Sequence, residues 1–190
     1  MSRIVVSEFV TLDGVMEDPG GAEKTERGGW AFQFERGPEG DKFKLDEVLA
    51  AGALLLGRTT YREFFAAWPS RTGEFADKMN GMPKYVVSTT LERAEWNNST
   101  LIKSNVAQSV SQLKAMPGND LLVAGSGQLV NTLMQHDLVD EYRLMVYPVV
   151  VGGGKRLFLE GSKRVPLRLV EAKPVGSGIV ILIYHPDQKR

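Results

Sequence analysis

The pattern of apolar and polar positions along the 190-residue chain predicts short buried strands that alternate with amphipathic helices. Compact runs rich in Val, Ile and Leu predict strands over residues 3–10, 53–56, 84–87 and 121–124, with a shorter one over 100–103. Apolar side chains at helical spacing predict helices over residues 41–50, 61–67, 106–116 and 128–135. The strand over 3–10 is the expected centre of the sheet.

The last third of the chain has a different pattern. An apolar strand over residues 141–151 contains Pro148, which predicts a position at an edge or a bend of the sheet. Two further strands, 167–173 and 178–185, predict a hairpin around 174–177. We therefore predict one α/β domain over 1–190, with a mixed, mostly parallel central sheet, an antiparallel C-terminal hairpin and helices on both faces.

The stretch 17–40 is rich in Gly, Pro and charged residues and contains Trp30, Phe32 and Phe34. Long loops inside compact domains are often functional, so one interpretation is a lid over a site. The other interpretation is a packed surface loop held by its aromatic side chains.

Composition excludes several classes of function. Twenty-three basic and 23 acidic residues give a formal net charge of +0, which argues against general binding to nucleic acids or anionic membranes. The absence of cysteine excludes disulfides, thiol catalysis and cysteine-built zinc sites, and the two histidines lack a ligand-like spacing, so no metal site is expected. Because no run is long enough to span a membrane and no signal peptide is visible, we expect a cytoplasmic protein.

Three predicted strands end in residues suited to phosphate binding. These are Gly57-Arg58-Thr59-Thr60, Ser88-Thr89-Thr90 and Gly125-Ser126-Gly127, the last leading into a helix at Gln128. The carboxyl ends of strands in open α/β sheets meet at one crevice, where Arg58 and the helix amides would face phosphates. Alternatively, the hydroxyls cap helices and Arg58 forms a surface ion pair. Together the three ends predict a dinucleotide phosphate site, although the G-x-G-x-x-G fingerprint is absent.

An ordered set of motifs spans nearly the whole chain: Thr11-Leu12-Asp13-Gly14, Leu56-Gly57-Arg58-Thr59-Thr60-Tyr61, Lys84-Tyr85-Val86-Val87-Ser88, Val123-Ala124-Gly125-Ser126-Gly127 and Pro148-Val149-Val150-Val151-Gly152-Gly153-Gly154. This set resembles the dihydrofolate reductase superfamily. It is most similar to the C-terminal reductase domain of the bifunctional riboflavin-biosynthesis deaminase-reductase, here in a stand-alone form without the deaminase.

The resemblance implies NADPH as cofactor. It places Gly57, Arg58, Thr59 and Thr60 at the phosphates, and Ser88, Thr89 and Thr90 near the adenosine 2′-phosphate. It places Gly125, Ser126 and Gly127, with Gln128 beside them, against the pyrophosphate and nicotinamide. Thr11, Asp13 and Gly14 would flank the nicotinamide.

The main candidate for a catalytic role toward the substrate is one acidic residue. Asp41 stands 16 positions before Gly57, a separation similar to that of the buried carboxylate that serves the pterin in dihydrofolate reductases. Alternatively, Asp41 lies in the first turn of its helix, where the helix dipole favours a carboxylate. Asp46 and Glu47 are weaker candidates.

Three positions bear on whether the substrate carries a phosphate group. The family commonly carries a lysine where Ser7 stands, and its loss argues against a phosphoribosyl substrate. Lys155 and Arg156 offer another phosphate-binding pair, or a solvated one.

The expected function is NADPH-dependent reduction of a small heterocyclic or imine-type substrate, with 5-amino-6-(5-phosphoribosylamino)uracil as the named example. The alternatives are a dihydrofolate or pteridine reductase, and a non-catalytic nucleotide-binding protein of the same fold. A homodimer is also expected, in which apolar late strands such as 142–151 extend or cover a partner's sheet.

Overall fold

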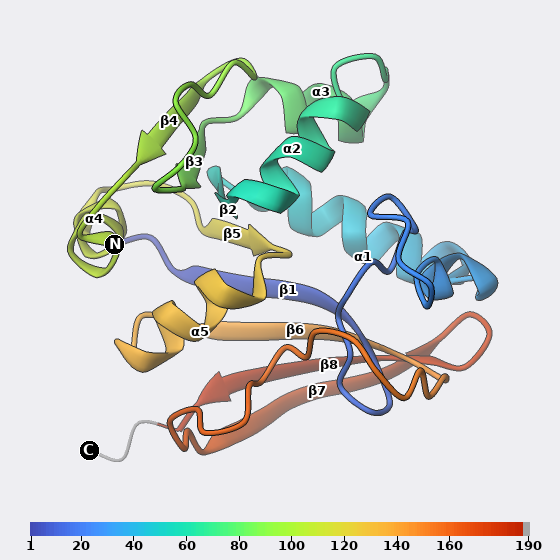
Figure 1. Cartoon of the computed structure of the whole chain (residues 1–190). Coiled ribbons are helices and arrows are strands. Elements are labelled where there is room, and N and C mark those ends of the chain that lie inside the picture. The colour runs from blue at the N-terminus through green and yellow to red at the C-terminus, as the bar shows by residue number, and fades with distance from the viewer. Residues whose placement is uncertain (188–190) are drawn as a thin grey trace.

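A single eight-stranded sheet forms the centre of the molecule (Figure 1). The computed structural model describes residues 1–187. The strands lie in the order β4-β3-β2-β5-β1-β6-β8-β7. Their bounds are β1 (Ile4–Thr11), β2 (Ala53–Gly57), β3 (Lys84–Val87), β4 (Ser99–Ile102), β5 (Leu121–Ala124), β6 (Glu141–Tyr147), β7 (Leu167–Val175) and β8 (Ile179–Pro186). The helices are η1 (Trp30–Gln33), α1 (Gly37–Ala50), α2 (Arg58–Ala67), α3 (Glu74–Gly81), α4 (Val106–Ala115) and α5 (Gly127–Gln135).

The central position of β1 is confirmed. β1 pairs in parallel with β5 on one side and with β6 on the other. Both of its faces are covered, which explains its nearly unbroken run of buried residues. The mostly parallel sheet is also confirmed, since only β7 and β8 run antiparallel to their neighbours.

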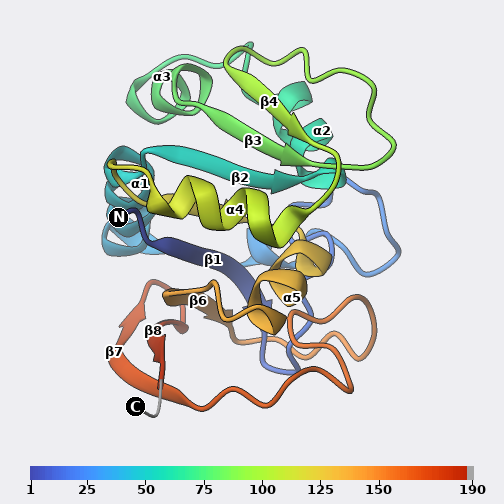
Figure 2. The same cartoon turned by 90° about the vertical axis from the view of Figure 1, so that its left-hand side faces the viewer.

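Helices cover both faces of the sheet, as Figures 1 and 2 show. Val48 of α1, Tyr61 of α2 and Met79 of α3 pack in one apolar cluster with residues of β2 and β3. Val110 of α4 and Leu133 of α5 belong to the cluster on the opposite face. Consecutive side chains of β1 therefore point alternately toward α1 and toward α5.

The C-terminal hairpin is confirmed, but the prediction for the strand before it is wrong in one respect. β6 ends at Tyr147, just before Pro148, and lies between β1 and β8. It is therefore an interior strand, and proline stands beyond its end because it lacks the N–H that the ladder needs. Since both of its edges are paired, residues 142–147 cannot extend a partner's sheet.

Two further differences concern helices. The sequence pattern did not predict α3, which lies in a polar stretch and buries only Ala76 and Met79. Helix α1 begins at Gly37 rather than at residue 41, with Pro38 in its first turn, where a missing N–H is harmless. None of the helices within residues 1–187 has both the length and the apolar character needed to cross a membrane.

Candidate functional site

The turns that follow β2 and β5 are joined by hydrogen bonds at the carboxyl edge of the sheet. The hydroxyl of Ser126 accepts the Gly57 N–H at 2.7 Å and donates to the Thr60 hydroxyl at 3.1 Å. A Cβ atom at Gly125 would lie 2.5 Å from Oγ1 of Thr60, and one at Gly57 would lie 2.8 Å from Oγ of Ser126. Both glycines are therefore required for the close approach of the two turns.

The third predicted strand end joins the other two through Arg58. Nη1 of Arg58 donates to the hydroxyl of Thr90 at 2.5 Å. The hydroxyl of Ser88 is buried and accepts the N–H groups of Thr90 and Leu91, so it shapes the turn after β3. The convergence of all three strand ends is thus confirmed, with the side chains of Arg58, Thr59, Thr89, Thr90 and Gln128 on the surface.

Both helices that begin at this edge lack a side-chain cap. Gly57 precedes α2 and Ser126 precedes α5, and neither N-terminus has a side-chain capping hydrogen bond. The alternative in which hydroxyls of the first turn, those of Thr59 or Thr60, cap the following helix is therefore wrong, because α2 already begins at Arg58. Uncapped N–H groups carry a partial positive charge, which suits phosphate oxygens. With the guanidinium of Arg58 beside them, these groups fit the phosphates of a dinucleotide.

The turn after β1 has a clear structural role. The carboxylate of Asp13 accepts the Thr11 hydroxyl at 2.6 Å and the Gly152 N–H at 2.8 Å. The Thr11 hydroxyl and two backbone N–H groups hold the pKa of Asp13 at about 2. Gly14 has φ of +79°, a conformation that glycine adopts most easily. Asp13 thus anchors the start of the glycine-rich loop 152–154, with Thr11 holding its carboxylate. Contact of Thr11, Asp13 and Gly14 with a cofactor stays a prediction.

Lys155 and Arg156 lie on the surface and contact neighbouring residues of the chain. Nζ of Lys155 lies 3.0 Å from Glu17 and 3.4 Å from Glu23, and Arg156 donates to the carbonyl of Asp13. The pair is solvent-exposed, as the second interpretation expects, and it also contacts two glutamates and the turn after β1. Binding of a substrate phosphate by this pair stays a prediction.

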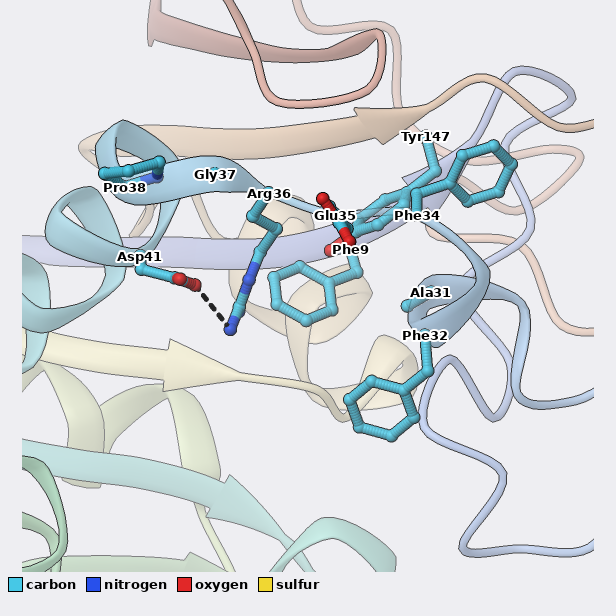
Figure 3. Close-up of a pocket in the computed structure, with 10 residues that line it drawn as sticks. All are labelled: Phe9, Ala31, Phe32, Phe34, Glu35, Arg36, Gly37, Pro38, Asp41 and Tyr147. Carbon is cyan, nitrogen blue, oxygen red and sulfur yellow. Dashed lines mark ion pairs between the residues drawn. The ribbon is translucent and has the colours of Figure 1, made fainter.

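A cavity of about 380 Å³ opens beside the N-terminal part of α1 (Figure 3). It is lined by Phe9, Ala31, Phe32, Phe34, Glu35, Arg36, Gly37, Pro38, Asp41 and Tyr147. Aromatic rings form much of the wall, and one ion pair crosses it, with Arg36 Nη2 3.0 Å from Asp41 Oδ1. The wall thus combines aromatic rings with charged side chains, which makes the cavity a candidate small-molecule site.

The structure places Asp41 at the cavity but changes its expected environment. The Asp41 side chain is 64% exposed, so it is not a buried carboxylate. It also lies in the second turn of α1, and the first-turn acid is Glu39. Both predictions for its environment are therefore wrong, because α1 begins four residues earlier than expected.

The buried carboxylate of α1 belongs to Glu47, one of the weaker candidates. Its Oε1 accepts the Ser7 hydroxyl at 2.8 Å and the Lys44 ammonium at 2.5 Å, and Arg143 lies 3.6 Å from its Oε2. Lys44 also donates to Ser7 and lies 5.3 Å from the centre of the Phe9 ring, which lines the cavity. A lysine ammonium therefore reaches Ser7 from α1, and the i,i+3 spacing of Lys44 and Glu47 was its only sequence signal.

The aromatic residues of the stretch 17–40 have two roles. Trp30 is buried, donates from its indole to the carbonyl of Glu17 and meets the ring of Tyr147 at 5.3 Å between centroids. Phe34 packs against Tyr147 as well, whereas Phe32 is 81% exposed at the cavity. The stretch is thus an anchored loop that also forms a wall of the cavity.

Three solved structures share this fold. The chain aligns over its full length with all of a protein from Shewanella sp. PV-4 that is named 'Putative riboflavin biosynthesis protein', at 22% identity and a TM-score of 0.77. It aligns over 98% of its length with 97% of a dihydrofolate reductase from Enterococcus faecalis in complex with NADP(H), at 13% identity and a TM-score of 0.63. It aligns over 97% of its length with 56% of a diaminohydroxyphosphoribosylaminopyrimidine deaminase/5-amino-6-(5-phosphoribosylamino)uracil reductase from Thermotoga maritima, at 13% identity and a TM-score of 0.68. The fold is therefore that of dihydrofolate reductase, as predicted.

Sequence comparison identifies the family. The chain is 30% identical over 188 residues to the uncharacterized protein YyaP of Bacillus subtilis, covering 96% of this chain and 94% of that protein. Residues 2–181 match the family model for the RibD C-terminal domain, and the chain belongs to this family.

Proposed function

We propose that this chain is an NADPH-dependent reductase that acts on a small heterocyclic or imine-type substrate. The observation that carries the proposal is the pair of interlocked glycine turns, which present two uncapped helix N-termini beside Arg58. Membership of the RibD C-terminal domain family and the shared fold with reductases support it.

The residues of the turns have separate tasks in this proposal. The N–H groups at the starts of α2 and α5 bind the pyrophosphate, and Arg58 binds the 2′-phosphate. The Thr90 hydroxyl orients the guanidinium of Arg58, which it already contacts. When bound, the cofactor supplies the hydride, so the protein contributes mainly orientation.

The cavity beside α1 is the proposed substrate site. The rings of Phe9, Phe32 and Tyr147 suit a flat heterocycle, and the side chain of Arg36 extends beside Phe9 toward Asp41 (Figure 3). The Arg36–Asp41 pair would orient polar groups of that ring. Our named candidate substrate is 5-amino-6-(5-phosphoribosylamino)uracil.

Cofactor titration tests the proposal. NADPH and NADH are titrated against tryptophan fluorescence with the wild-type protein, Arg58→Ala and Arg62→Ala. Arg58→Ala should weaken NADPH about tenfold more than NADH, because a lost charge-assisted bond to phosphate is worth roughly 1.5–3 kcal/mol. Arg62 is exposed on the same helix, one turn later, and serves as the matched control. If the wild-type protein binds neither nucleotide, the proposal is wrong.

A substrate panel then identifies the reaction. NADPH consumption is followed with 5-amino-6-(5-phosphoribosylamino)uracil, dihydrofolate and oxidised pteridines. Turnover of the first supports the named reaction, and turnover of a pteridine alone indicates the alternative reductase. Tight NADPH binding without turnover on any compound would favour a nucleotide-binding protein.

A further inference from the structure

Glu8 is a buried acid on β1 that the proposed function does not use. The residue is 4% exposed, and its side chain points to the face opposite Ser7. Its Oε2 accepts the N–H of Gly125 at 3.1 Å. Its Oε1 has no hydrogen-bond partner among residues 1–187. A buried carboxylate with one hydrogen bond is unfavourable in its charged form, because it has lost most of its hydration.

The charges around Glu8 do not neutralise it. The charged groups that act on Glu8 are Lys44 and Glu47 of α1, one attractive and one repulsive. The ammonium of Lys44 already contacts Glu47 and Ser7. Burial, opposed by the Gly125 N–H, raises the pKa of Glu8 to about 8. At neutral pH the folded protein therefore holds Glu8 in its neutral acid form.

The position of Glu8 links its charge to the phosphate site. Gly125 begins the turn that leads into the uncapped N-terminus of α5. An ionised Glu8 would place a full negative charge within hydrogen-bond distance of this turn, in surroundings that screen it poorly. The turn has little freedom to move away, because Ser126 is bonded to Gly57 and Thr60. A phosphate bound at the turn would thus be repelled by the ionised form of Glu8 and tolerated by its acid form.

We propose that Glu8 is a positioning residue of the cofactor site, which holds the Gly125 amide and must carry a proton for the turn to accept the phosphates of the cofactor. The inference rests on the proposed function, since it requires a dinucleotide at this turn. By linkage, binding of the cofactor favours the protonated form of Glu8 as much as protonation favours binding.

The pH dependence of NADPH affinity is the first test. The dissociation constant is measured from about pH 7 to about pH 9.5, where the cofactor phosphates remain ionised. Above about pH 8 the wild-type affinity should fall by up to tenfold per pH unit. Glu8→Gln keeps a carbonyl acceptor for Gly125 and cannot ionise, so its affinity should stay constant. Glu47→Gln, the matched buried acid, should keep the wild-type slope.

Two results would overturn the inference: a wild-type affinity that does not change with pH, or an unchanged slope in Glu8→Gln. Other groups that titrate in this range, such as Lys84 with a pKa lowered by burial to about 8, are present in all the variants.

Proton uptake is a second test that needs no variant. Calorimetry of NADPH binding near pH 8.5, in two buffers of different ionisation enthalpy, should show roughly three quarters of a proton taken up per NADPH, which is the fraction of Glu8 ionised before binding when its pKa is about 8. NADPH binding without proton uptake would disprove the role of Glu8 and leave the proposed function standing. Failure of NADPH to bind near pH 7, where Glu8 is protonated, would instead disprove the proposed function.

Discussion

The two buried glutamates, Glu47 and Glu8, lie on opposite sides of β1 and have opposite environments. Glu47 faces a lysine, an arginine and a serine hydroxyl beneath the cavity. Glu8 faces one backbone amide beside the glycine turn. Glu47 is 3% exposed and Glu8 is 4% exposed, so burial alone does not distinguish them. The number of partners determines whether a buried acid can remain charged.

The region beneath the cavity and the glycine turn are held in place by different interactions. Beneath the cavity, paired charges fix the position of Lys44 below the Phe9 ring. At the glycine turn, positions are fixed by close backbone approach and hydroxyl bonds, with no ion pair to Glu8 in residues 1–187. Removal of a charge should therefore destabilise the first region, whereas added volume, or ionisation of Glu8, should disturb the second.

The largest expected effect is that of Glu47→Ala. Removing the carboxylate leaves the half-buried ammonium of Lys44 without its charged partner, whereas Arg143 keeps its ion pair with Glu141. Breaking such a pair should cost about 3–5 kcal/mol of unfolding free energy, measured by urea denaturation. Glu39→Ala, which removes an exposed ion pair of the same helix, should cost less than about 1 kcal/mol. Equal losses in the two variants would contradict the comparison.

The next effect is the pH dependence of stability due to Glu8. Its pKa is raised to about 8 by burial, so the folded state holds a proton that the unfolded state releases above the ordinary carboxyl pKa. Stability should be greatest in mild acid and fall by up to about 1.4 kcal/mol per pH unit until about pH 8. In Glu8→Gln this part of the slope should be absent, as urea unfolding across the range would show. Identical slopes in both proteins would refute the assignment.

Added side-chain volume at the glycine turn should have a somewhat smaller effect on the free energy of unfolding. Gly125→Ala places a Cβ atom 2.5 Å from the Thr60 hydroxyl oxygen, at a residue whose φ is +67°. We expect a loss of about 2–3 kcal/mol and strongly weakened NADPH binding, because the turns must separate. Gly81→Ala, where nothing lies within 4 Å, is the control and should leave both properties nearly unchanged. A normal NADPH affinity in Gly125→Ala would remove the turn from the cofactor site.

The smallest effect on stability is expected for Asp41→Asn. Asp41 is exposed, so the free energy of unfolding should change by less than about 0.5 kcal/mol. Turnover on an identified substrate should fall without loss of NADPH affinity, because Asp41 lines the cavity and lies apart from the turns. Unchanged turnover would assign Asp41 to the surface pair with Arg36 alone.

Much of the fold could be predicted because its signals are local. Short Val- and Leu-rich runs define the parallel strands, and residues directly after them define the three strand ends. The cavity could not be predicted in this way. Tyr147 meets the loop aromatics only because β6 lies beside β1 with Thr11 opposite Tyr147. Glu8 resembles an ordinary polar position in sequence, and it is buried only because α5 covers that face.

The alternation of side chains along β1 limits how this strand can vary. Ser7 points toward Glu47, and Glu8 points toward the glycine turn. Inserting or deleting one residue within Ile4–Thr11 would exchange the two faces for every position beyond it. Glu8 would then stand on the same side as Glu47, and the glycine turn would lose its acid. Libraries of variants should therefore accept substitutions in β1 that conserve size and polarity, but no change in its length.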